Sequence, residues 1–218
     1  MDNITHSLVG IALADVVTGR RSTKSDRRLA LGAGIVAANL PDIDLAYSGI
    51  APQPLGFLLH HRGHTHTVVG LVALALLLVL SYRLVPTVRR LRTADRLRLW
   101  CLIAVALASH LLLDWLNSYG VHPFHPFDSR WFYGDAVFIF EPSLWLVLGI
   151  AVAWSARSRA GKVAATLPIA LFPLTMLSMN IIPPEGVASL AIVGVPFAWI
   201  TRVAHREPEP EWPSRAAC

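Results

Sequence analysis

Charged side chains are scarce in this sequence. Lysine, arginine, aspartate and glutamate make up 15% of its 218 residues, whereas soluble domains carry about a quarter. Hydrophobic residues make up 54%, and the mean hydropathy is +0.52. This deficit of charge excludes a separate soluble domain of any size and indicates a membrane protein.

Cysteine is also nearly absent. Cys101 lies inside an apolar run and Cys218 is the last residue, so we expect no disulfide between them, and cysteine does not indicate a redox compartment. The first residues, MDNITHSLVG, lack the basic segment that opens a cleavable signal, so we expect them to be retained. The sequence shows no internal repeat.

Long apolar runs dominate what is present. A membrane-spanning helix needs roughly 20 residues, and runs near that length occupy about 66–84, 98–117, 163–180 and 187–203. Three further candidates are shorter or interrupted, at 3–18, 28–46 and about 142–156. We therefore predict an all-α, polytopic membrane protein with about five to seven membrane helices. We expect a single helical domain at 1–204, in which residues 1–145 carry the motifs. A disordered tail at 205–218 is expected to follow it.

Basic residues are confined to alternate loops. Of the 19 lysines and arginines, 17 lie in four segments, at 19–28, 83–98, 157–162 and 202–218. The positive-inside rule places these segments in the cytoplasm and the N-terminus outside the inner membrane. The net charge of +5 is thus a topology signal, and we expect no nucleic-acid partner.

Histidines and carboxylates gather on the opposite, outer side. Eight of the nine histidines, all but His205, fall in outer loops or in the outer turns of helices. Topology was assigned from lysine and arginine alone, so this segregation is an independent observation. Four outer helix ends carry candidate metal ligands, namely His6, Asp42 and Asp44 in PDID, His61 and His66 in HHRGHTH, and His110 and Asp114 in SHLLLD.

The spacing of His110 and Asp114 suits a shared metal ion. Residues four apart lie on one face of a helix, so both side chains can reach one ion. A charged aspartate inside an apolar helix costs about 2.5–3.5 kcal/mol on insertion scales, and a bound cation would offset that cost. Imidazole with carboxylate suits Zn²⁺, with Mn²⁺ or Fe as alternatives. We predict one or two divalent ions at the outer face of the inner membrane.

Each candidate also has a structural interpretation. His6 alone is an ordinary polar residue near a helix start, and aspartates after a proline commonly cap turns. The histidine cluster alone would suit an interfacial loop. His122, His125 and Glu141 lie in or after HPFHPF, where we favour a structural role. The convergence of several candidates on one face favours the metal site.

These motifs together resemble the YdjM family. The resemblance covers about residues 1–145 and rests on THSLVG at 5–10, NLPDID at 39–44, HRGHTH at 61–66 and SHLLLDWLNSYGV at 109–121. Members are described as inner-membrane-associated, metal-dependent hydrolases, and the family name also mentions LexA binding. The resemblance implies that His64 is a variable position, and that the motif positions are His61, Arg62, His66, His110 and Asp114.

A more distant similarity is to zinc-dependent phospholipase C and the single-strand nucleases. Those enzymes are all-helical and hold several zinc ions with an early His, an Asp, a further His and a His-x-x-x-Asp pair. The candidates of this sequence follow the same order. The enzymes also use a processed N-terminal amine, whereas this chain is expected to keep Met1, so we predict one or two ions and not three.

The predicted function is a membrane-bound hydrolase of phosphoester bonds in lipid or amphiphilic substrates. Metal-activated water would be the nucleophile, and a carboxylate not bound to metal, Asp42 or Asp44, would be the general base. Arg62 has a planar guanidinium that suits a phosphate, with a salt bridge to one of the aspartates as the alternative.

Two other functions remain open. A transporter or metal-handling protein also places polar residues inside a helical bundle, although the inner helix halves here hold few ionisable residues apart from Asp15. A regulatory protein that binds a cytoplasmic partner such as LexA would use the basic segment 83–98. Topology and anionic lipid also account for that segment.

Overall fold

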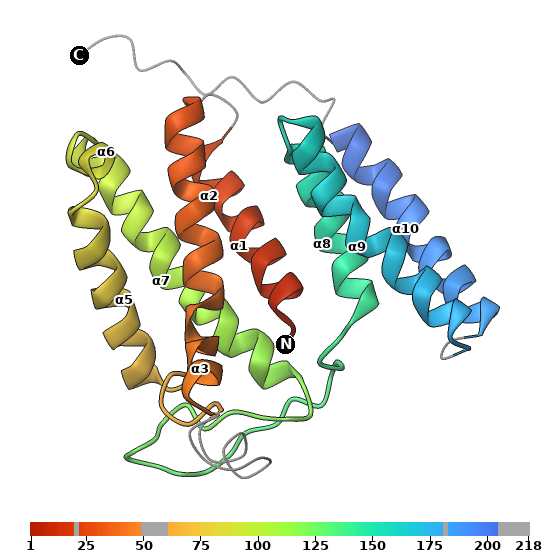
Figure 1. Cartoon of the computed structure of the whole chain (residues 1–218), viewed down its shortest axis with the longest axis horizontal. Coiled ribbons are helices and arrows are strands. Elements are labelled where there is room, and N and C mark those ends of the chain that lie inside the picture. Colours follow the sequence, from red (N-terminus) through yellow and green to blue (C-terminus); the bar gives the residue numbers. More distant parts are fainter. Residues whose placement is uncertain (20–21, 49–60, 181–182, 205–218) are drawn as a thin grey trace. The chain divides into compact units, whose positions relative to one another are not determined.

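The computed structural model describes residues 1–19, 22–48, 61–180 and 183–204 (Figure 1). The helices are α1 (Asn3–Thr18), α2 (Lys24–Asn39), η1 (Leu40–Asp44), α3 (Leu45–Ser48), α5 (Val68–Arg83), α6 (Pro86–Arg89), α7 (Thr93–Leu116), α8 (Pro142–Ser155), α9 (Arg159–Ser178) and α10 (Pro184–Ala204). A helix therefore covers each of the seven predicted apolar segments. The all-α prediction is confirmed for the described residues.

The chain divides into two compact units, Met1–Glu141 and Pro142–Cys218. The single helical domain expected over 1–204 stays a prediction. The boundary falls close to residue 145, where the motif-bearing part was expected to end. The predicted disordered tail, 205–218, lies outside the described residues.

Three helices are long and apolar enough to cross a membrane, judged by length and composition among the described residues. They comprise the continuous stretch Lys24–Ser48, α7 and α9. Three others, α1, α5 and α8, are apolar but have only 14 to 16 residues. The count of five to seven membrane helices stays a prediction.

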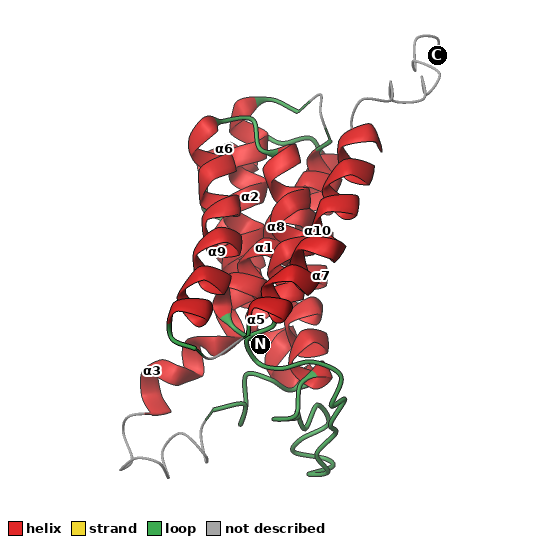
Figure 2. Ribbon diagram, turned by 90° about the vertical axis from the view of Figure 1, so that its right-hand side faces the viewer, coloured by secondary structure: helices red, strands yellow, loops and turns green. Residues whose placement is uncertain are grey.

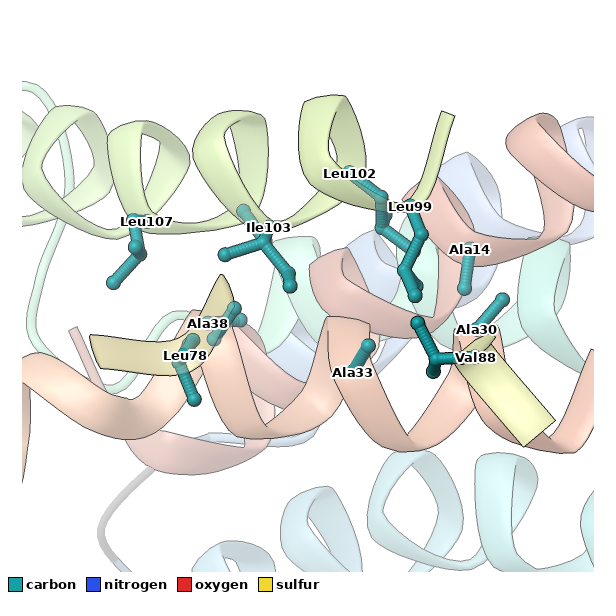
Figure 3. Packing of buried hydrophobic residues seen from close by; sticks show 12 residues of the cluster. Ala14, Ala30, Ala33, Ala38, Leu78, Val88, Leu99, Leu102, Ile103 and Leu107 are labelled. Carbon is teal, nitrogen blue, oxygen red and sulfur yellow. The ribbon is translucent and has the colours of Figure 1, made fainter. Parts of the chain in front are cut away.

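The first unit is built on close packing of α1, α2 and α7, with α5 against α7. Small residues let α1 and α2 approach, as is common between membrane helices. A Cβ atom added to Gly34 would lie 2.4 Å from the carbonyl oxygen of Gly10. Figure 3 shows the resulting core, in which alanines of α1 and α2 face leucines of α5 and α7. Its fully buried members include Ala33, Ala37, Ala38, Ile103 and Ala106.

The loop 117–141 lies at one end of this unit, at the same end as α3 and the start of α1 (Figures 1 and 2). Two isolated bridges order it, between Asn117 and Val137 and between Val121 and Phe132. Its end returns to the N-terminus, where the backbone N–H of Asp2 donates to the carbonyl oxygen of Ile139 at 3.1 Å. This end of the unit gathers the predicted site residues.

The second unit is a bundle of α8, α9 and α10. The rings of Trp145 and Phe172 join α8 to α9, with centroids 4.6 Å apart. Prolines lie inside α9 and α10, as membrane helices tolerate. Among the described residues of this unit the structure places no candidate metal ligand group.

Candidate metal centre

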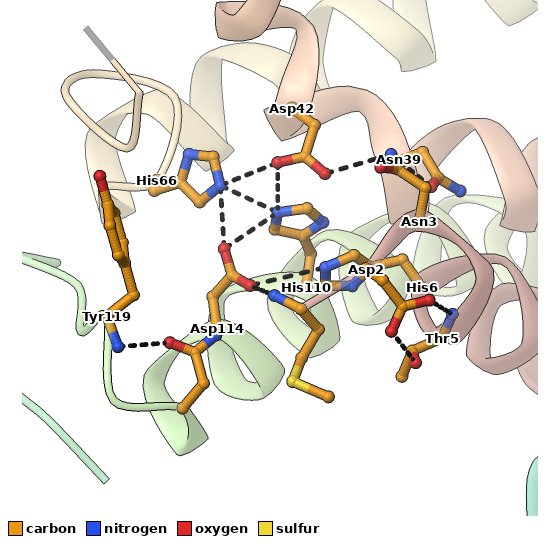
Figure 4. Close-up of polar contacts among 12 residues, drawn as sticks. Asp2, Asn3, Thr5, His6, Asn39, Asp42, His66, His110, Asp114 and Tyr119 are labelled. Carbon is orange, nitrogen blue, oxygen red and sulfur yellow. Dashed lines mark hydrogen bonds and ion pairs between the residues drawn. The ribbon is translucent and has the colours of Figure 1, made fainter. Parts of the chain in front are cut away.

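Four side chains from three separate segments meet at one point of the first unit (Figure 4). Asp42 comes from η1, His66 precedes α5 by two residues, and His110 and Asp114 lie near the end of α7. One nitrogen or oxygen atom of each lies within 4.8 Å of the other three. Three of the residues are buried, and Asp42 is the least buried, with 8% of its side chain exposed. The i,i+4 pair predicted on α7 thus faces ligands supplied by two other segments.

Five of the six distances between these atoms are close to the edge of a zinc coordination tetrahedron, and all four atoms lie within 4.8 Å of one another. His66 Nε2 lies 3.0 Å from His110 Nε2 and 3.1 Å from Asp114 Oδ2. It lies 3.4 Å from Asp42 Oδ1. His110 Nε2 completes two more edges, at 3.5 Å to Asp114 Oδ2 and 3.6 Å to Asp42 Oδ1. Zinc bound tetrahedrally at its usual bond lengths would require edges of about 3.3 Å. The donor set therefore fits a four-coordinate divalent ion.

Both imidazoles of this set are held through their other ring nitrogen. His110 Nδ1 lies 2.7 Å from the carbonyl oxygen of Ala38. Because a carbonyl oxygen can only accept a hydrogen bond, Nδ1 carries the proton. The neutral ring therefore presents an unprotonated Nε2 to the cluster. His66 Nδ1 lies 3.2 Å from Asp44 Oδ2. Such outer contacts fix the tautomer and orientation of metal-binding histidines.

Asp44 is fully buried and heavily hydrogen-bonded. Its Oδ2 accepts from the backbone N–H of Arg62 and from the hydroxyl of Thr65, both at 2.8 Å. Its Oδ1 lies 3.0 Å from His61 Nδ1. These bonds tie the turn 61–67 to η1. They also leave Asp44 best suited to orienting His66.

Asp42 belongs to a second group of possible metal ligands. One atom from each of Asp42, Asp44 and His61 lies within 4.8 Å of the other two. Asp42 is common to both groups, and a carboxylate has two oxygens that can serve neighbouring ions. The geometry is therefore compatible with one ion or with two, as the sequence predicted.

Arg62 lies behind Asp114 with its guanidinium buried. Its Nη2 is 3.1 Å from Asp114 Oδ1, and its Nη1 donates to the carbonyl oxygen of Gly120 at 2.8 Å. The guanidinium carbon lies 4.7 Å from the centre of the Tyr119 ring. The residue has a left-handed backbone, with φ 63°, a conformation that non-glycine residues rarely adopt. The structure thus has the aspartate salt bridge that the sequence left as the alternative to phosphate binding.

The start of α1 brings two more groups to the cluster. His6 is fully buried, stacks on His110 with ring centroids 3.8 Å apart, and has Nε2 3.5 Å from Asp114 Oδ1. Neither of its ring nitrogens has a hydrogen-bond partner among the described residues. The α-amino group of Met1 contacts Asp114 Oδ1. A buried imidazole without a hydrogen bond, beside the Asp114 carboxylate, is a nitrogen donor available to a cation.

Negative charge dominates this part of the molecule. Burial alone lowers the pKa of His66, but hydrogen bonds to Asp114, Asp42 and Asp44 outweigh burial and raise the pKa to about 10. An imidazole held in its cationic form in this way shows how strongly the carboxylates favour positive charge. A divalent ion at the same point would provide that charge.

All seven predicted ligands lie in this one network, although four segments of chain supply them. The sequence did not reveal several supporting groups, namely Ala38, Thr65, Asn117 and the amino group of Met1. Ala38 acts through its backbone, which no side-chain pattern shows. His122 has the structural role that we favoured, since its Nε2 lies 2.7 Å from the carbonyl oxygen of Arg62 and its ring stacks on Trp131.

A known family of proteins matches most of this chain. The family model described as "YdjM inner membrane protein" matches residues 1–183. The chain belongs to the YdjM inner membrane protein family. The match extends beyond the first unit, past the end of α9.

Two relatives carry no further description of activity. The chain is 27% identical to the uncharacterized protein YfhP of Bacillus subtilis (strain 168) over 176 residues, which cover 78% of this chain and 51% of YfhP. It is 36% identical to the inner membrane protein YbcI of Escherichia coli (strain K12) over 119 residues, which cover 54% of this chain and 61% of YbcI. The matches thus span only about half to three fifths of these relatives. No solved structure matches the chain.

Proposed function

We propose that this chain is a membrane-bound, metal-dependent hydrolase of phosphoester bonds in lipid or amphiphilic substrates. The observation that carries the proposal is the cluster of two imidazole nitrogens and two carboxylate oxygens, in which five of the six distances are 3.0–3.6 Å and all four atoms lie within 4.8 Å of one another. Asp42, His66, His110 and Asp114 would hold a divalent ion, most suitably zinc. Asp42 would also contribute to a second ion with Asp44 and His61.

The residues around the ion have separable roles. When bound, the ion supplies Lewis acidity, which polarises a phosphoryl oxygen and lowers the pKa of water towards 7. Asp42 has the least buried side chain of the four, so its displacement from the ion would open a position for water and would free this carboxylate to accept a proton from that water. Asp44 holds the Nδ1 of His66. Arg62, already paired with Asp114, would position that carboxylate and not bind the substrate.

An apolar groove beside the site supports a lipid substrate. It has a volume of about 590 Å³ and runs between α5 and α7 under the loop 117–141, lined by residues such as Val72, Leu111 and Phe124. No charged side chain among the described residues lines it. Its wall begins at Val68, two residues after His66. A groove of this kind suits an acyl chain whose headgroup reaches the ion.

The arrangement of charges favours an outward-facing site over a transport path. By the positive-inside rule, the ends of α5 and α7 that carry the ligands would face the periplasm. Asp15, the ionisable residue noted in the inner half of α1, lies 2.6 Å from Arg27. This ion pair accounts for the charge of Asp15, and no group of candidate metal ligands lies there among the described residues.

Metal analysis of purified protein tests the proposal. Protein in mild detergent should contain a stoichiometric transition metal and should hydrolyse a chromogenic phosphodiester. Asp114→Asn keeps the shape of the side chain and removes its charge, and it should abolish both. Asp128→Asn is the matched control, because Asp128 pairs with Arg130 in the loop, away from the site. Full metal content in the Asp114 variant would refute the site, and metal without hydrolysis would refute the enzyme.

A further inference from the structure

A second site lies at the other end of the first unit, where α6 joins α5 to α7 (Figure 1). A cavity of about 570 Å³ opens there. Three arginines line it, Arg83 from α5, Arg89 from α6 and Arg96 from α7. The apolar side chains of its lining are Val88, Leu97 and Trp100. Nothing in the proposed hydrolase uses this cavity.

The three arginines have no acidic partner among the described residues. Asp95 is the one acidic residue of the segment 83–98, and it pairs with Arg98 at 3.0 Å. Arg96 donates weakly to the hydroxyl of Thr93, at 3.4 Å. The cavity therefore concentrates positive charge that the protein leaves uncompensated.

The side chain of Arg89 is held in place by a hydrogen bond to the backbone. The Nε of Arg89 donates to the carbonyl oxygen of Arg83 at 2.9 Å, which anchors the side chain over the end of α5. The bond leaves the terminal nitrogens of the guanidinium for another acceptor. Val88 beneath it is buried, with 1% of its surface exposed. The turn thus presents a fixed guanidinium on an apolar floor.

The position of the cavity matches the level of lipid headgroups. It lies at the first turns of α7, a helix long and apolar enough to span the bilayer. Leu97 is 60% exposed and Trp100 is half-buried, a combination typical of the membrane interface. A ligand here would have an anionic head beside the arginines and an apolar chain along α7.

We propose that this cavity binds the phosphate headgroup of an anionic phospholipid from the cytoplasmic leaflet. Guanidinium groups pair with phosphate through two parallel hydrogen bonds, and basic pockets at the cytoplasmic ends of membrane helices recognise anionic lipids. The exposed leucine and tryptophan favour a lipid over a soluble protein, because a lipid satisfies the charged and the apolar parts at once.

The test compares two double variants of the full chain with equal loss of charge. Arg89→Gln with Arg96→Gln removes two cavity residues, whereas Arg90→Gln with Arg92→Gln removes two arginines of the same segment that do not line the cavity. Native mass spectrometry of detergent-purified protein counts the retained lipids. Thermal unfolding is then measured with added phosphatidylglycerol, phosphatidylethanolamine or inorganic phosphate.

Wild type and the Arg90/Arg92 control should retain phosphatidylglycerol and be stabilised by it more than by phosphatidylethanolamine. The Arg89/Arg96 variant should bind it roughly 30-fold more weakly, as expected for two lost arginine contacts. Arg89→Lys with Arg96→Lys should recover part of the binding and separates loss of charge from misfolding. Equal loss in both Gln variants, equal stabilisation by inorganic phosphate, or a cytosolic protein retained by the cavity in place of lipid would overturn the proposal.

Discussion

The Nδ1 atom of His110 lies 2.7 Å from the carbonyl oxygen of Ala38. This contact joins α7 to α2 in the buried core and fixes the rotation of the imidazole. The carbonyl is available because Ala38 lies in the last turn of α2, where helix carbonyls lose their intrahelical partners. The end of one membrane helix thereby orients a ligand carried by another.

Asp44 should act only indirectly on the affinity of the site formed by Asp42, His66, His110 and Asp114. Replacing Asp44 with asparagine removes the charge behind His66 Nδ1 but leaves the four corners of the tetrahedron in place. Loss of such an outer partner costs roughly 10–100-fold in metal affinity. Titration of metal-free protein with zinc measures this change. If Asp44→Asn abolishes binding as fully as Asp114→Asn, then Asp44 is a direct ligand.

Arg62 should contribute mainly to stability. Arg62→Met removes the buried guanidinium from Asp114, and breaking a buried pair in this way costs roughly 3–5 kcal/mol. Denaturant unfolding of the purified protein gives the difference in free energy of unfolding. Arg130→Met is the comparison, since the Arg130–Asp128 pair is exposed and exposed pairs contribute about 0–1 kcal/mol. Unchanged stability with lost substrate affinity would restore phosphate binding as the role of Arg62.

Two glycines of α2 should respond oppositely to alanine. A Cβ atom at Gly34 would meet the backbone of Gly10 at 2.4 Å, whereas one at Gly32 has open space. Gly34→Ala should therefore destabilise the protein by about 1–3 kcal/mol, because α1 and α2 must move apart. Gly32→Ala should be neutral or stabilise by about 0.5–1 kcal/mol, because alanine favours the helix. Thermal unfolding of the two variants decides, and equal behaviour would contradict the close packing.

Chelation should lower thermal stability reversibly. A ligand that binds only the folded state, at 100 times its dissociation constant, stabilises by about 2.7 kcal/mol. Removing the ion should lower the free energy of unfolding by about that amount and the midpoint of thermal unfolding with it, and adding zinc back should restore both. His66→Ala protein should not respond to either treatment. A midpoint that ignores the chelator in wild type would argue against a resident ion.

The sequence predicted helices and ligands better than it predicted their partners. Long apolar runs show where helices form, and the i,i+4 spacing placed His110 and Asp114 on one face. Asp42 and Asp44 could not be told apart from the sequence, because both follow the same proline. The structure separates them, since Asp44 is surrounded by donors from the turn 61–67 and Asp42 is less buried.

The role of Arg62 illustrates what sequence pattern does not contain. Its charge suggested a phosphate partner, but its contacts with Asp114 and Gly120 arise from tertiary packing of two segments about 50 residues apart. The motifs end near the division at Glu141, but the apolar runs on either side of it look alike. The local sequence pattern predicts helices, but contacts between distant segments depend on how those helices pack.

The unequal exposure of the tetrahedron fixes a direction of approach. His66, His110 and Asp114 close three corners of it, and Asp42, the least buried of the four, marks the last. An incoming group would have to enter past Asp42, and this carboxylate is the donor most easily displaced when it does. The protein scaffold would then determine the direction of attack. Substrate analogues should therefore differ in affinity according to how well they fit the approach past Asp42.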